Sequence, residues 1–331
     1  MYSSGSEILV LSQSEVASLF DLDAAYESQR NAFTAIGEGA PLPAEKVMLN
    51  YADTATVTFA YAARLAPFGP ICKFGSVNPS NVDLGLPTVS STILALDPHT
   101  GELAAVMDGT TITNRRTAAA SVLVMNELAQ PGELRATIIG YGVQAREHVR
   151  MIAARARPAR LRVYGRSFEK CQSFVREMSA ETGIDMQAMP DIQSSVGDAN
   201  VVVLCTTSTT PLIASDWIAE GTLVLSLGSI SATRCEVGQD FVRRVGRVIV
   251  DDKHSAHRQA GPVIAAIQSG LLHDKDLVEF GHVLVGQASG RANLKDVIYY
   301  NSTGIGLQDA AAVAAILTKA KARVIGQRIS L

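Results

Sequence analysis

Aromatic residues are scarce in this chain of 331 residues, at 5%, and Trp217 is the single tryptophan. So few aromatic side chains argue against a stacking platform for single-stranded nucleic acid or sugars. An excess of positive charge is also missing, because 29 Lys and Arg residues face 32 Asp and Glu residues and the net charge is −3. The sequence therefore predicts no general binding to nucleic acid, which needs a basic surface.

Cysteine is rare as well, and the four cysteines, at positions 72, 171, 205 and 235, are far apart and form no C-x-x-C pair. This pattern is typical of reduced thiols and predicts a cytoplasmic protein without a disulfide framework. The first residues lack a basic segment followed by a long apolar stretch, so no secretory signal is predicted. No uncharged apolar run reaches about 18 residues, so we expect no transmembrane helix and no membrane partner.

What the chain has in abundance is aliphatic sequence. Hydrophobic residues make up 47% of it and charged residues 18%. These proportions are typical of a globular protein with an ample core, and at about 150 residues per domain the length suggests two domains. The aliphatic excess suits helices packed on a buried parallel sheet.

Hydrophobic spacing divides the chain into two parts. The first third predicts an α+β arrangement, with a helix that begins at Glu15 behind a Ser14 cap, a helix over 22–36, and strands over 46–51, 54–63, 71–74, 88–96 and 103–107, the last two as a hairpin. An Ala-rich helix over 117–128 then precedes strands over 136–139, 161–164, 201–205, 223–227 and 248–251, with helices over 146–156 and 168–180. This alternation indicates βαβ units and a parallel sheet. A last helix over 304–321 is expected to pack on the first part.

The segment Gly140-Tyr141-Gly142-Val143-Gln144-Ala145 fits the G-x-G-x-x-A pattern of dinucleotide-binding loops. An apolar strand precedes it, a predicted helix follows, and a second strand arrives about 20 residues later, which is the context that the pattern requires. Gly140 permits a tight turn, Gly142 leaves room for a pyrophosphate, and Ala145 lets the helix pack closely on the strand. The free N–H groups at the helix start would face the phosphates, so the sequence predicts an NAD(P)-binding domain.

The second strand of this unit ends in Tyr164-Gly165-Arg166-Ser167, without the Asp or Glu that usually binds the ribose hydroxyls of NAD. Arg166 and Ser167 stand where a 2′-phosphate could be bound, and a guanidinium suits phosphate geometrically. The sequence therefore favours NADP(H) over NAD(H). The alternative is that Arg166 stacks on the adenine and Ser167 caps the next helix.

Lysine and arginine side chains of the first part suggest a second site. Lys73 lies within an apolar strand, and a buried lysine has a lowered pKa that suits proton transfer near neutrality. Arg115 and Arg116 precede the helix that leads into the nucleotide fold, and arginine binds a carboxylate through two parallel hydrogen bonds. Thr117 is expected at the helix start, where N–H groups can hold a phosphate. These residues predict a clamp for an amino or imino acid, the alternative being an interdomain salt bridge and a helix cap.

Together these motifs resemble the ornithine cyclodeaminase/μ-crystallin family. The resemblance covers nearly the whole chain. It is carried by Lys73, Asn78-Pro79-Ser80-Asn81, Gly85-Leu86-Pro87-Thr88-Val89, Asp97 with Gly101, Met107-Asp108-Gly109-Thr110, Thr113, Arg116-Thr117-Ala118-Ala119-Ala120-Ser121, the loop over 140–145, Cys205-Thr206-Thr207, Gly228-Ser229, Glu236, Asp251-Asp252, and Ser302-Thr303-Gly304 with Asp309.

The resemblance implies an α/β chain in which a Rossmann NAD(P)-binding domain, residues 117–302, is inserted into an α+β substrate-binding and dimerisation domain, residues 1–116 and 303–331. It implies a homodimer in which the sheets of two substrate-binding domains pack together. Members of the family move a hydride between nicotinamide and the α-carbon of an amino or imino acid, in the cleft between the domains. No metal site is predicted.

The resemblance also implies roles for single residues. Lys73 and Arg116 match substrate-carboxylate positions, with Thr88 close to them and Lys46 where the family often has an arginine. Cofactor contacts are implied for Thr117, Val143, Gln144, Thr206, Arg234 and Ser302.

One departure from the family pattern bears on the reaction. Cyclodeaminases and the amino-acid-oxidising members of the family carry an Asp about six residues before the glutamate that matches Glu236, and this chain has Ile230 there. The expected activity is therefore NAD(P)H-dependent reduction of a small α-imino acid, with Lys73 as first and Asp108 as second candidate for the proton donor. A dicarboxylate imine such as iminosuccinate would need a further cation, which Arg115, Lys46 or a histidine could supply. The alternatives are an NAD-dependent cyclodeaminase that releases ammonia from a diamino acid, and a non-catalytic nucleotide-binding protein.

Overall fold

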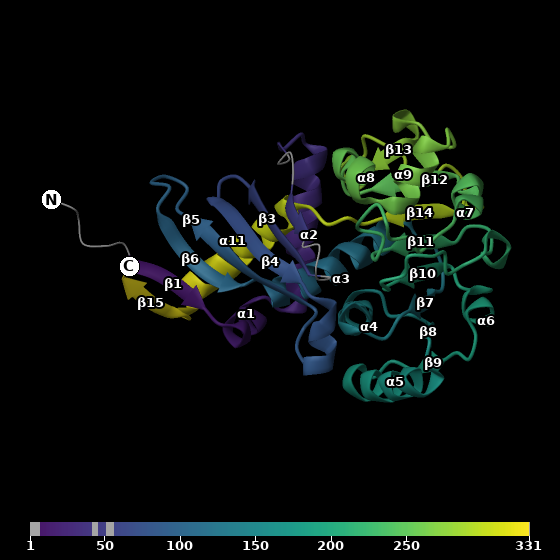
Figure 1. The fold of residues 1–331 in the computed structure, drawn as a ribbon, viewed down its shortest axis with the longest axis horizontal. Coiled ribbons are helices and arrows are strands. Elements are labelled where there is room, and N and C mark those ends of the chain that lie inside the picture. Colours follow the sequence, from purple (N-terminus) through teal and green to yellow (C-terminus); the bar gives the residue numbers. More distant parts are fainter. Residues whose placement is uncertain (1–6, 42–45, 51–55, 331) are drawn as a thin grey trace. The chain divides into compact units, whose positions relative to one another are not determined.

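The computed structural model describes residues 7–41, 46–50 and 56–330 (Figure 1). The chain forms two compact units, unit 1 (Met1–Arg116 with Gly306–Leu331) and unit 2 (Thr117–Ile305). Helix α3 (Gly109–Leu128) carries the chain from one unit into the other, and the chain returns just before α11 (Gly306–Arg323). Unit 2 is therefore inserted into the sequence of unit 1. Within the described ranges, no helix is both long and apolar enough to cross a bilayer.

Unit 1 is built on a mixed seven-stranded sheet. In spatial order its strands are β15 (Gln327–Ser330), β1 (Glu7–Leu11), β6 (Leu103–Asp108), β5 (Val89–Leu96), β4 (Pro70–Val77), β3 (Val57–Arg64) and β2 (Val47–Asn50). β1 and β6 run parallel and the remaining neighbours are antiparallel. Along β4, Lys73 is buried and Phe74 is exposed, because successive side chains of a strand point to opposite faces.

The helices of unit 1 are α1 (Gln13–Leu19), α2 (Leu22–Gly37), the 3-10 helix η1 (Pro79–Leu84) and α11. The carboxylate of Asp21 accepts a hydrogen bond from the N–H of Ala24 at 2.8 Å and so begins α2. α11, drawn in yellow in Figure 1, packs against α2 and β3. Its small alanine side chains let the helix lie close to the sheet, and this brings Asp309 into the interior.

Unit 2 contains an eight-stranded sheet in which all neighbouring strands run parallel. In spatial order the strands are β13 (Leu277–Glu279), β12 (Arg247–Val250), β14 (Ile298–Asn301), β11 (Leu223–Ser226), β10 (Val201–Leu204), β7 (Arg135–Ile139), β8 (Arg160–Tyr164) and β9 (Met186–Ala188). Every residue of β10 and β11 is buried, as is typical of central strands in a parallel sheet.

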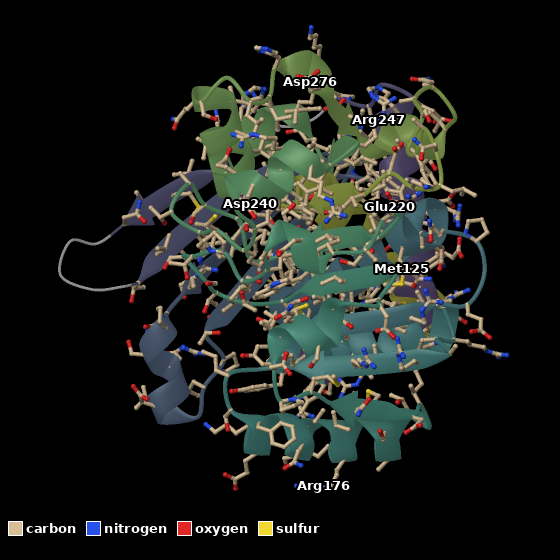
Figure 2. All side chains as sticks on the ribbon, turned by 90° about the vertical axis from the view of Figure 1, so that its right-hand side faces the viewer. Met125, Arg176, Glu220, Asp240, Arg247 and Asp276 are labelled. Atoms are coloured by element: carbon tan, nitrogen blue, oxygen red, sulfur yellow. The ribbon has the colours of Figure 1, made fainter. Side chains whose placement is uncertain are left out.

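The helices of unit 2 connect these strands. They are α4 (Val143–Arg155), α5 (Phe168–Thr182), α6 (Ile192–Val196), η2 (Ser215–Trp217), α7 (Gln239–Arg244), α8 (Lys253–Gln259), α9 (Gly261–Gln268), η3 (Asp274–Asp276) and α10 (Phe280–Leu284). Figure 2 shows Arg176 on α5 and Asp276 in η3 at opposite ends of this unit, beside the edge strands β9 and β13. The result is a Rossmann-like fold, so the predicted fold class is confirmed.

Most predicted elements are present. The strands expected over 88–96, 103–107, 136–139, 161–164, 201–205, 223–227 and 248–251 agree with the structure to within one residue at each end. The helix over 22–36 and the hairpin of β5 and β6 are confirmed too. Tyr51, Thr54 and Ala55, which the sequence assigned to strands, lie outside the described residues.

Three helix starts were predicted wrongly. Ser12, not Ser14, caps α1, because Ser12 and Glu15 form a reciprocal capping box. α4 starts at Val143 inside the glycine-rich loop, not at Arg146. α3 begins at Gly109, eight residues before Thr117, because the carboxylate of Asp108 accepts hydrogen bonds from the N–H groups of Thr110 (3.2 Å) and Thr111 (2.8 Å). Thr117 therefore lies inside α3, and the prediction that it offers a helix N-terminus to a phosphate is wrong.

Candidate active site

A lysine is buried in the interior of unit 1. Lys73 of β4 is 1% exposed, and its Nζ donates hydrogen bonds to Oδ1 of Asp309 (2.9 Å) and to Oγ1 of Thr113 (2.5 Å). The hydroxyl of Thr113 gives its own proton to the carbonyl of Gly109 at 2.6 Å, so its oxygen is held as an acceptor toward Lys73. Two of the three N–H bonds of the ammonium are thereby used, and the third has no further hydrogen-bond acceptor among the described residues.

Arg116 lies beside this pair. Its side chain is 7% exposed, Nη1 donates to Oε1 of Gln308 at 3.2 Å, and Nε lies 3.7 Å from Oδ1 of Asp309. Nε makes no hydrogen bond within the described part of the chain. A buried guanidinium with unused donor capacity is suited to bind a carboxylate or phosphate oxygen.

Asp309 is the anion that holds both cations. It is completely buried in the first turn of α11, and Oδ2 accepts a hydrogen bond from the hydroxyl of Tyr61 at 2.7 Å. Burial alone would raise the pKa of the Asp309 carboxyl, but the charges of Lys73 and Arg116 and the hydrogen bonds outweigh it and hold the pKa below its ordinary value. Burial lowers the pKa of Lys73, against the opposing effect of Asp309. Burial also raises the pKa of Tyr61, and the charge of Asp309 adds to this, so the phenol stays protonated and donates.

A second lysine reaches the same ring. Nζ of Lys46 lies 5.6 Å from the ring centroid of Tyr61, and Nζ of Lys73 lies 5.8 Å from it. The structure thus brings Lys46, Lys73 and Arg116 together around Tyr61 and Asp309. Asp108 also contributes to the field at Lys73. Among the described residues, Lys73 and Arg116 share Asp309 as their buried anion.

The other predicted substrate residues have different surroundings. Nη1 of Arg115 donates to the carbonyls of Ala17 and Phe20, both at 2.6 Å, and so fixes the end of α1. The carboxylate of Asp108 caps α3, as described above. Thr88 precedes β5, five residues from Ile93, which pairs with Lys73, so it lies about 16 Å along the strand from that pair. Along the sheet it is therefore not a neighbour of Lys73.

In unit 2 the glycine-rich loop has the geometry that a dinucleotide needs. Gly140 adopts φ +124°, and a Cβ there would come within 2.6 Å of the carbonyl oxygen of Cys205. Gly142 is the N-cap of α4, and a Cβ there would meet nothing within 4 Å. Ala145 is fully buried. The open approach to Gly142 and the N–H groups at the start of the 13-residue helix α4 therefore fit a pyrophosphate.

Two buried carboxylates organise the loops that carry the other predicted cofactor residues. Oε1 of Glu236 accepts from the N–H (2.8 Å) and the hydroxyl (2.7 Å) of Thr206, and Oε2 accepts from the hydroxyl of Ser226 (2.7 Å) and the N–H of Gly228 (2.8 Å). Burial raises the pKa of Glu236, opposed by these hydrogen bonds. Glu236 thereby ties the loop after β10 to the loop after β11.

The second of these carboxylates is Asp251, directly after β12. Its Oδ2 accepts from the hydroxyl of Ser302 (3.0 Å) and from the N–H groups of Thr303 (2.9 Å) and Gly304 (2.8 Å). Its Oδ1 accepts from the hydroxyl of Tyr300. Asp251 therefore fixes the segment after β14. Arg234 lies in the loop that follows β11, and its N–H donates to the carbonyl of Ser231 at 3.0 Å.

At the end of β8, Arg166 is exposed, and its guanidinium makes no hydrogen bond or ion pair within the described ranges. The hydroxyl of Ser167 accepts from the N–H of Lys170 at 3.3 Å and caps α5, as the alternative interpretation held.

Next to the glycine-rich loop, α4 buries a histidine. His148 is completely buried, and Nδ1 lies 2.7 Å from the carbonyl oxygen of Gln144, to which it must donate. Burial lowers the pKa of His148 to about 4. The folded protein therefore keeps this imidazole neutral, whereas the unfolded chain protonates it at an ordinary pKa of about 6.5.

This difference predicts an acid-sensitive stability. Between pH 6.5 and 4 the unfolded chain binds the extra proton, so stability falls as the pH falls, and this histidine should account for about 2 kcal/mol of the loss between pH 7 and pH 5. Urea unfolding at both pH values should show that His148→Leu loses about that much less than the wild type. His99→Leu, at an exposed turn, is the control and should leave the pH dependence unchanged. An equal pH dependence of wild type and His148→Leu would contradict the account.

These features define a class of protein: an α/β chain with a dinucleotide-type glycine-rich loop in unit 2 and a buried cluster of Lys73, Arg116 and Asp309 in unit 1. Comparison with known proteins identifies its family. The model of the ornithine cyclodeaminase/mu-crystallin family matches residues 6–323. The chain therefore belongs to the ornithine cyclodeaminase/mu-crystallin family, as its motifs predicted.

Three solved structures illustrate the similarity. The Δ(1)-pyrroline-2-carboxylate reductase of Thermococcus litoralis, in complex with NADH and L-proline, superposes with a TM-score of 0.92 at 26% identity over 97% of this chain and 100% of the other. An archaeal alanine dehydrogenase dimer with bound NAD gives 0.91 at 26% identity over 98% and 100%. The iminosuccinate reductase of Paracoccus denitrificans, in complex with NAD⁺, gives 0.91 at 25% identity over 98% and 100%.

Sequence reasoning missed the importance of three residues. Asp309 and Glu236 were noted only as parts of the family resemblance, and Tyr61 was not noted at all. The signal for Asp309 was an acidic residue on the apolar face of an Ala-rich helix, where a carboxylate is rarely buried without a partner. Its partner Lys73 stands 236 residues away in the sequence.

Proposed function

We propose that this chain reduces a small α-imino acid to the corresponding L-amino acid with NAD(P)H as the hydride donor. The coarser assignment, an NAD-dependent oxidoreductase of the alanine dehydrogenase and imino-acid reductase type, follows from the family and from the relatives described above. The observation that supports reduction of an α-imino acid in particular is the buried cluster of Lys73, Arg116 and Asp309. Lys73 and Arg116 share one fully buried carboxylate there, and both cations are suited to bind the carboxylate of a substrate.

In this proposal Arg116 and Lys73 bind the carboxylate of the imino acid. Arg116 contributes its planar guanidinium, and Lys73 contributes its third N–H bond. Asp309 is a positioning residue, because it orients both cations and compensates part of their charge without needing to touch the substrate. Binding the substrate carboxylate then brings the buried charges closer to balance, which favours the complex.

An imine accepts a hydride readily only when its nitrogen is protonated, so the site needs an acid. Lys73 is our candidate for that acid, because burial lowers its pKa. In that role its third N–H faces the imine nitrogen and Arg116 alone holds the carboxylate; otherwise Lys73 binds the carboxylate and orients a water that serves as the acid. Asp108 is the weaker candidate because both of its carboxylate oxygens are engaged at the start of α3. Arg115 is likewise assigned to holding α1 rather than to binding substrate.

The cofactor would be held by unit 2. The loop Gly140, Gly142, Val143, Gln144 and Ala145 would hold the pyrophosphate, and Thr206, Arg234 and Ser302 follow strands whose carboxyl ends form the usual binding edge of such a sheet. When bound, the dinucleotide supplies the hydride. Thr117 stays in the cofactor set on the family resemblance alone.

We propose a preference for NADP(H) over NAD(H). The end of β8 offers no carboxylate for ribose hydroxyls, and Arg166 presents a free guanidinium there. The relatives above were solved with NADH or NAD, so the preference depends on these residues of the chain itself.

The substrate class extends to imines with a second carboxylate. Lys46, beside Tyr61, is the cation that would receive it, and the relative from Paracoccus denitrificans is named for iminosuccinate. Cyclodeamination is disfavoured because Ile230, 39% exposed in the loop after β11, stands where that reaction would need a carboxylate.

A panel assay tests the function. The chain should oxidise NADPH in the presence of Δ(1)-pyrroline-2-carboxylate, or of pyruvate or oxaloacetate mixed with ammonia or methylamine, and the amino acid should accumulate in equal amount. Absence of turnover with every imine, together with ammonia release from ornithine, would replace the proposal by cyclodeamination.

We also propose a homodimer formed through the outer face of the unit 1 sheet. Lys73 points toward Asp309 of α11, so Phe74, the next residue of β4, points to the opposite face, where it is 57% exposed. Leu94 on β5 and Val47 on β2 are 36% and 60% exposed. An apolar sheet face of this kind is typical of a subunit interface.

Introducing charge at this face should break the dimer. Phe74→Glu with Leu94→Glu is expected to convert a particle of twice the 35.1 kDa chain mass into a monomer in light scattering after gel filtration, because two buried carboxylates would face their symmetry mates without partners. The control is Val324→Glu, which replaces an apolar side chain that is 90% exposed near the end of α11. A double variant that keeps the wild-type mass would exclude this face as the interface.

A further inference from the structure

A tyrosine covers a glycine at the end of β8. Gly165 is buried, and a Cβ built there would lie 2.1 Å from Cδ1 and 2.2 Å from Cε1 of Tyr141. Gly165 is not among the glycines with positive φ, so its backbone would accept any residue. The ring of Tyr141 is therefore what makes glycine necessary at this position.

The loop and the strand end are held against each other. The N–H of Gly140 donates to the carbonyl of Tyr164 at 2.8 Å, which joins the residue before Tyr141 to the residue before Gly165. Gly140 in turn has the left-handed φ of +124° and lies against the backbone of Cys205. The backbone before Tyr141 is consequently held beside the strand end, and the ring of Tyr141 lies over Gly165.

Position 165 matters because it directly follows the strand end at which dinucleotide sites usually discriminate between cofactors. A carboxylate there binds the ribose hydroxyls of NAD and repels a 2′-phosphate. With the ring of Tyr141 in place, no side chain can begin at residue 165. The next residue, Arg166, is exposed and has no partner within the described ranges.

We propose that the contact between Tyr141 and Gly165 is a cofactor-selecting element, in which the ring of Tyr141 excludes a carboxylate from the ribose site and leaves the 2′-phosphate of NADP(H) to Arg166. The inference rests on the proposed function for its cofactor class and adds the residues that set the phosphate preference. Tyr141 acts indirectly, because its ring excludes a side chain at position 165. Arg166 acts directly, because its guanidinium touches the 2′-phosphate.

The element predicts a non-additive response to substitution. Gly165→Asp alone places a side chain within the ring of Tyr141, so it should weaken NADP⁺ binding without improving NAD⁺ binding. Tyr141→Ala alone should leave the preference within about threefold of the wild type. Combining Tyr141→Ala with Gly165→Asp should tighten NAD⁺ binding and weaken NADP⁺ binding, each by roughly 10- to 100-fold. The new carboxylate would accept a charge-assisted hydrogen bond from the ribose of NAD⁺ and would repel the 2′-phosphate of NADP⁺.

Isothermal titration calorimetry with NADP⁺ and NAD⁺, in the absence of imine, measures these affinities without relying on turnover. Gly165→Ala is the matched control, since it adds the same Cβ without charge and should weaken both cofactors equally. Arg166→Ala should weaken NADP⁺ by roughly 10- to 100-fold and leave NAD⁺ within about threefold. Circular dichroism confirms that each variant is folded.

Two results would overturn the proposal. The first is a Gly165→Asp variant that prefers NAD⁺ as strongly as the double variant, since Tyr141 would then exclude nothing. The second is a wild type that binds NAD⁺ more tightly than NADP⁺. Failure of the proposed function is a separate outcome, in which the cofactors bind as predicted and no imine is reduced.

Discussion

Replacing Asp309 with alanine is expected to lower the free energy of unfolding by about 3–5 kcal/mol, because it leaves Lys73 charged, buried and without its anion. Nζ of Lys73 and the hydroxyl of Tyr61 both donate to this carboxylate, and Arg116 lies beside it. Urea unfolding at pH 7, followed by circular dichroism, measures the change, and amide hydrogen exchange in β4 and α11 should locate it. Such a loss is a large share of the total stability of an ordinary domain.

A double-mutant cycle isolates the ion pair. Adding Lys73→Met to Asp309→Ala removes the uncompensated charge and replaces it with an apolar chain of similar length, so the double variant should recover at least half of the loss. Asp309→Asn keeps the shape and should fall between wild type and Asp309→Ala. A cycle in which the two single effects simply add would show that the pair does not interact energetically.

Replacing Arg116 with methionine is expected to raise the KM for the imino acid by roughly 30- to several-thousand-fold, the equivalent of about 2–5 kcal/mol for a truncated buried charge pair. The affinity for NADP⁺ should change little, because the guanidinium contacts Gln308 and Asp309 of unit 1. Steady-state kinetics with varied imine and calorimetry with the cofactor separate the two effects. Arg116→Lys should recover only part of the loss, since an ammonium cannot form the two parallel hydrogen bonds.

Arg115 is the matched control for Arg116. It is the neighbouring arginine of α3, but Nη1 donates to the carbonyls of Ala17 and Phe20. Arg115→Met should therefore lower thermal stability and leave the KM for the imine within about threefold of the wild type. A change of that size corresponds to less than about 1 kcal/mol of substrate-binding free energy. A pair of variants with equal effects on KM would remove the distinction that the structure draws between them.

How far the sequence predicts the fold is illustrated by α3. The run Gly109-Thr110-Thr111-Ile112-Thr113 contains a glycine and four β-branched residues, which have low helix propensity, so local pattern placed the helix start at Thr117. The structure begins the helix at Gly109 because Asp108 caps it and Ile112 is completely buried. Tertiary packing thus overrides a weak local preference. The strands of unit 2 were easier to predict, because short continuous apolar runs are typical of strands that are buried on both faces of a parallel sheet.

The candidate site was predicted in part for a similar reason. A lysine within an apolar strand is unusual enough to be noticed, so Lys73 was identified before any contact was known. Its anion Asp309 is far away in the sequence, on a helix whose docking depends on the whole sheet, and no local pattern pairs the two. Arg115 and Arg116 are adjacent in the sequence, and the sequence gives no reason to assign only one of them to substrate binding. The structure distinguishes them because their side chains point in different directions.

The same limit applies to the cofactor side. The spacing of Gly140, Gly142 and Ala145 predicts the loop because each position has a local steric reason. Neither the four hydrogen bonds of Glu236 nor the position of the Tyr141 ring over Gly165 follows from spacing, because both depend on how separate loops approach one another.

Isotope transfer tests the central claim most directly. The chain is incubated with each imine of the panel and with NADPH carrying deuterium at C4 of the nicotinamide, on one face and then on the other, and the amino acid is examined by mass spectrometry. We predict that one of the two labelled cofactors yields an amino acid heavier by one deuterium at the α-carbon, and that Arg116→Met abolishes this product at low imine concentration. An amino acid without deuterium from either cofactor, or no amino acid from any imine, would contradict the account.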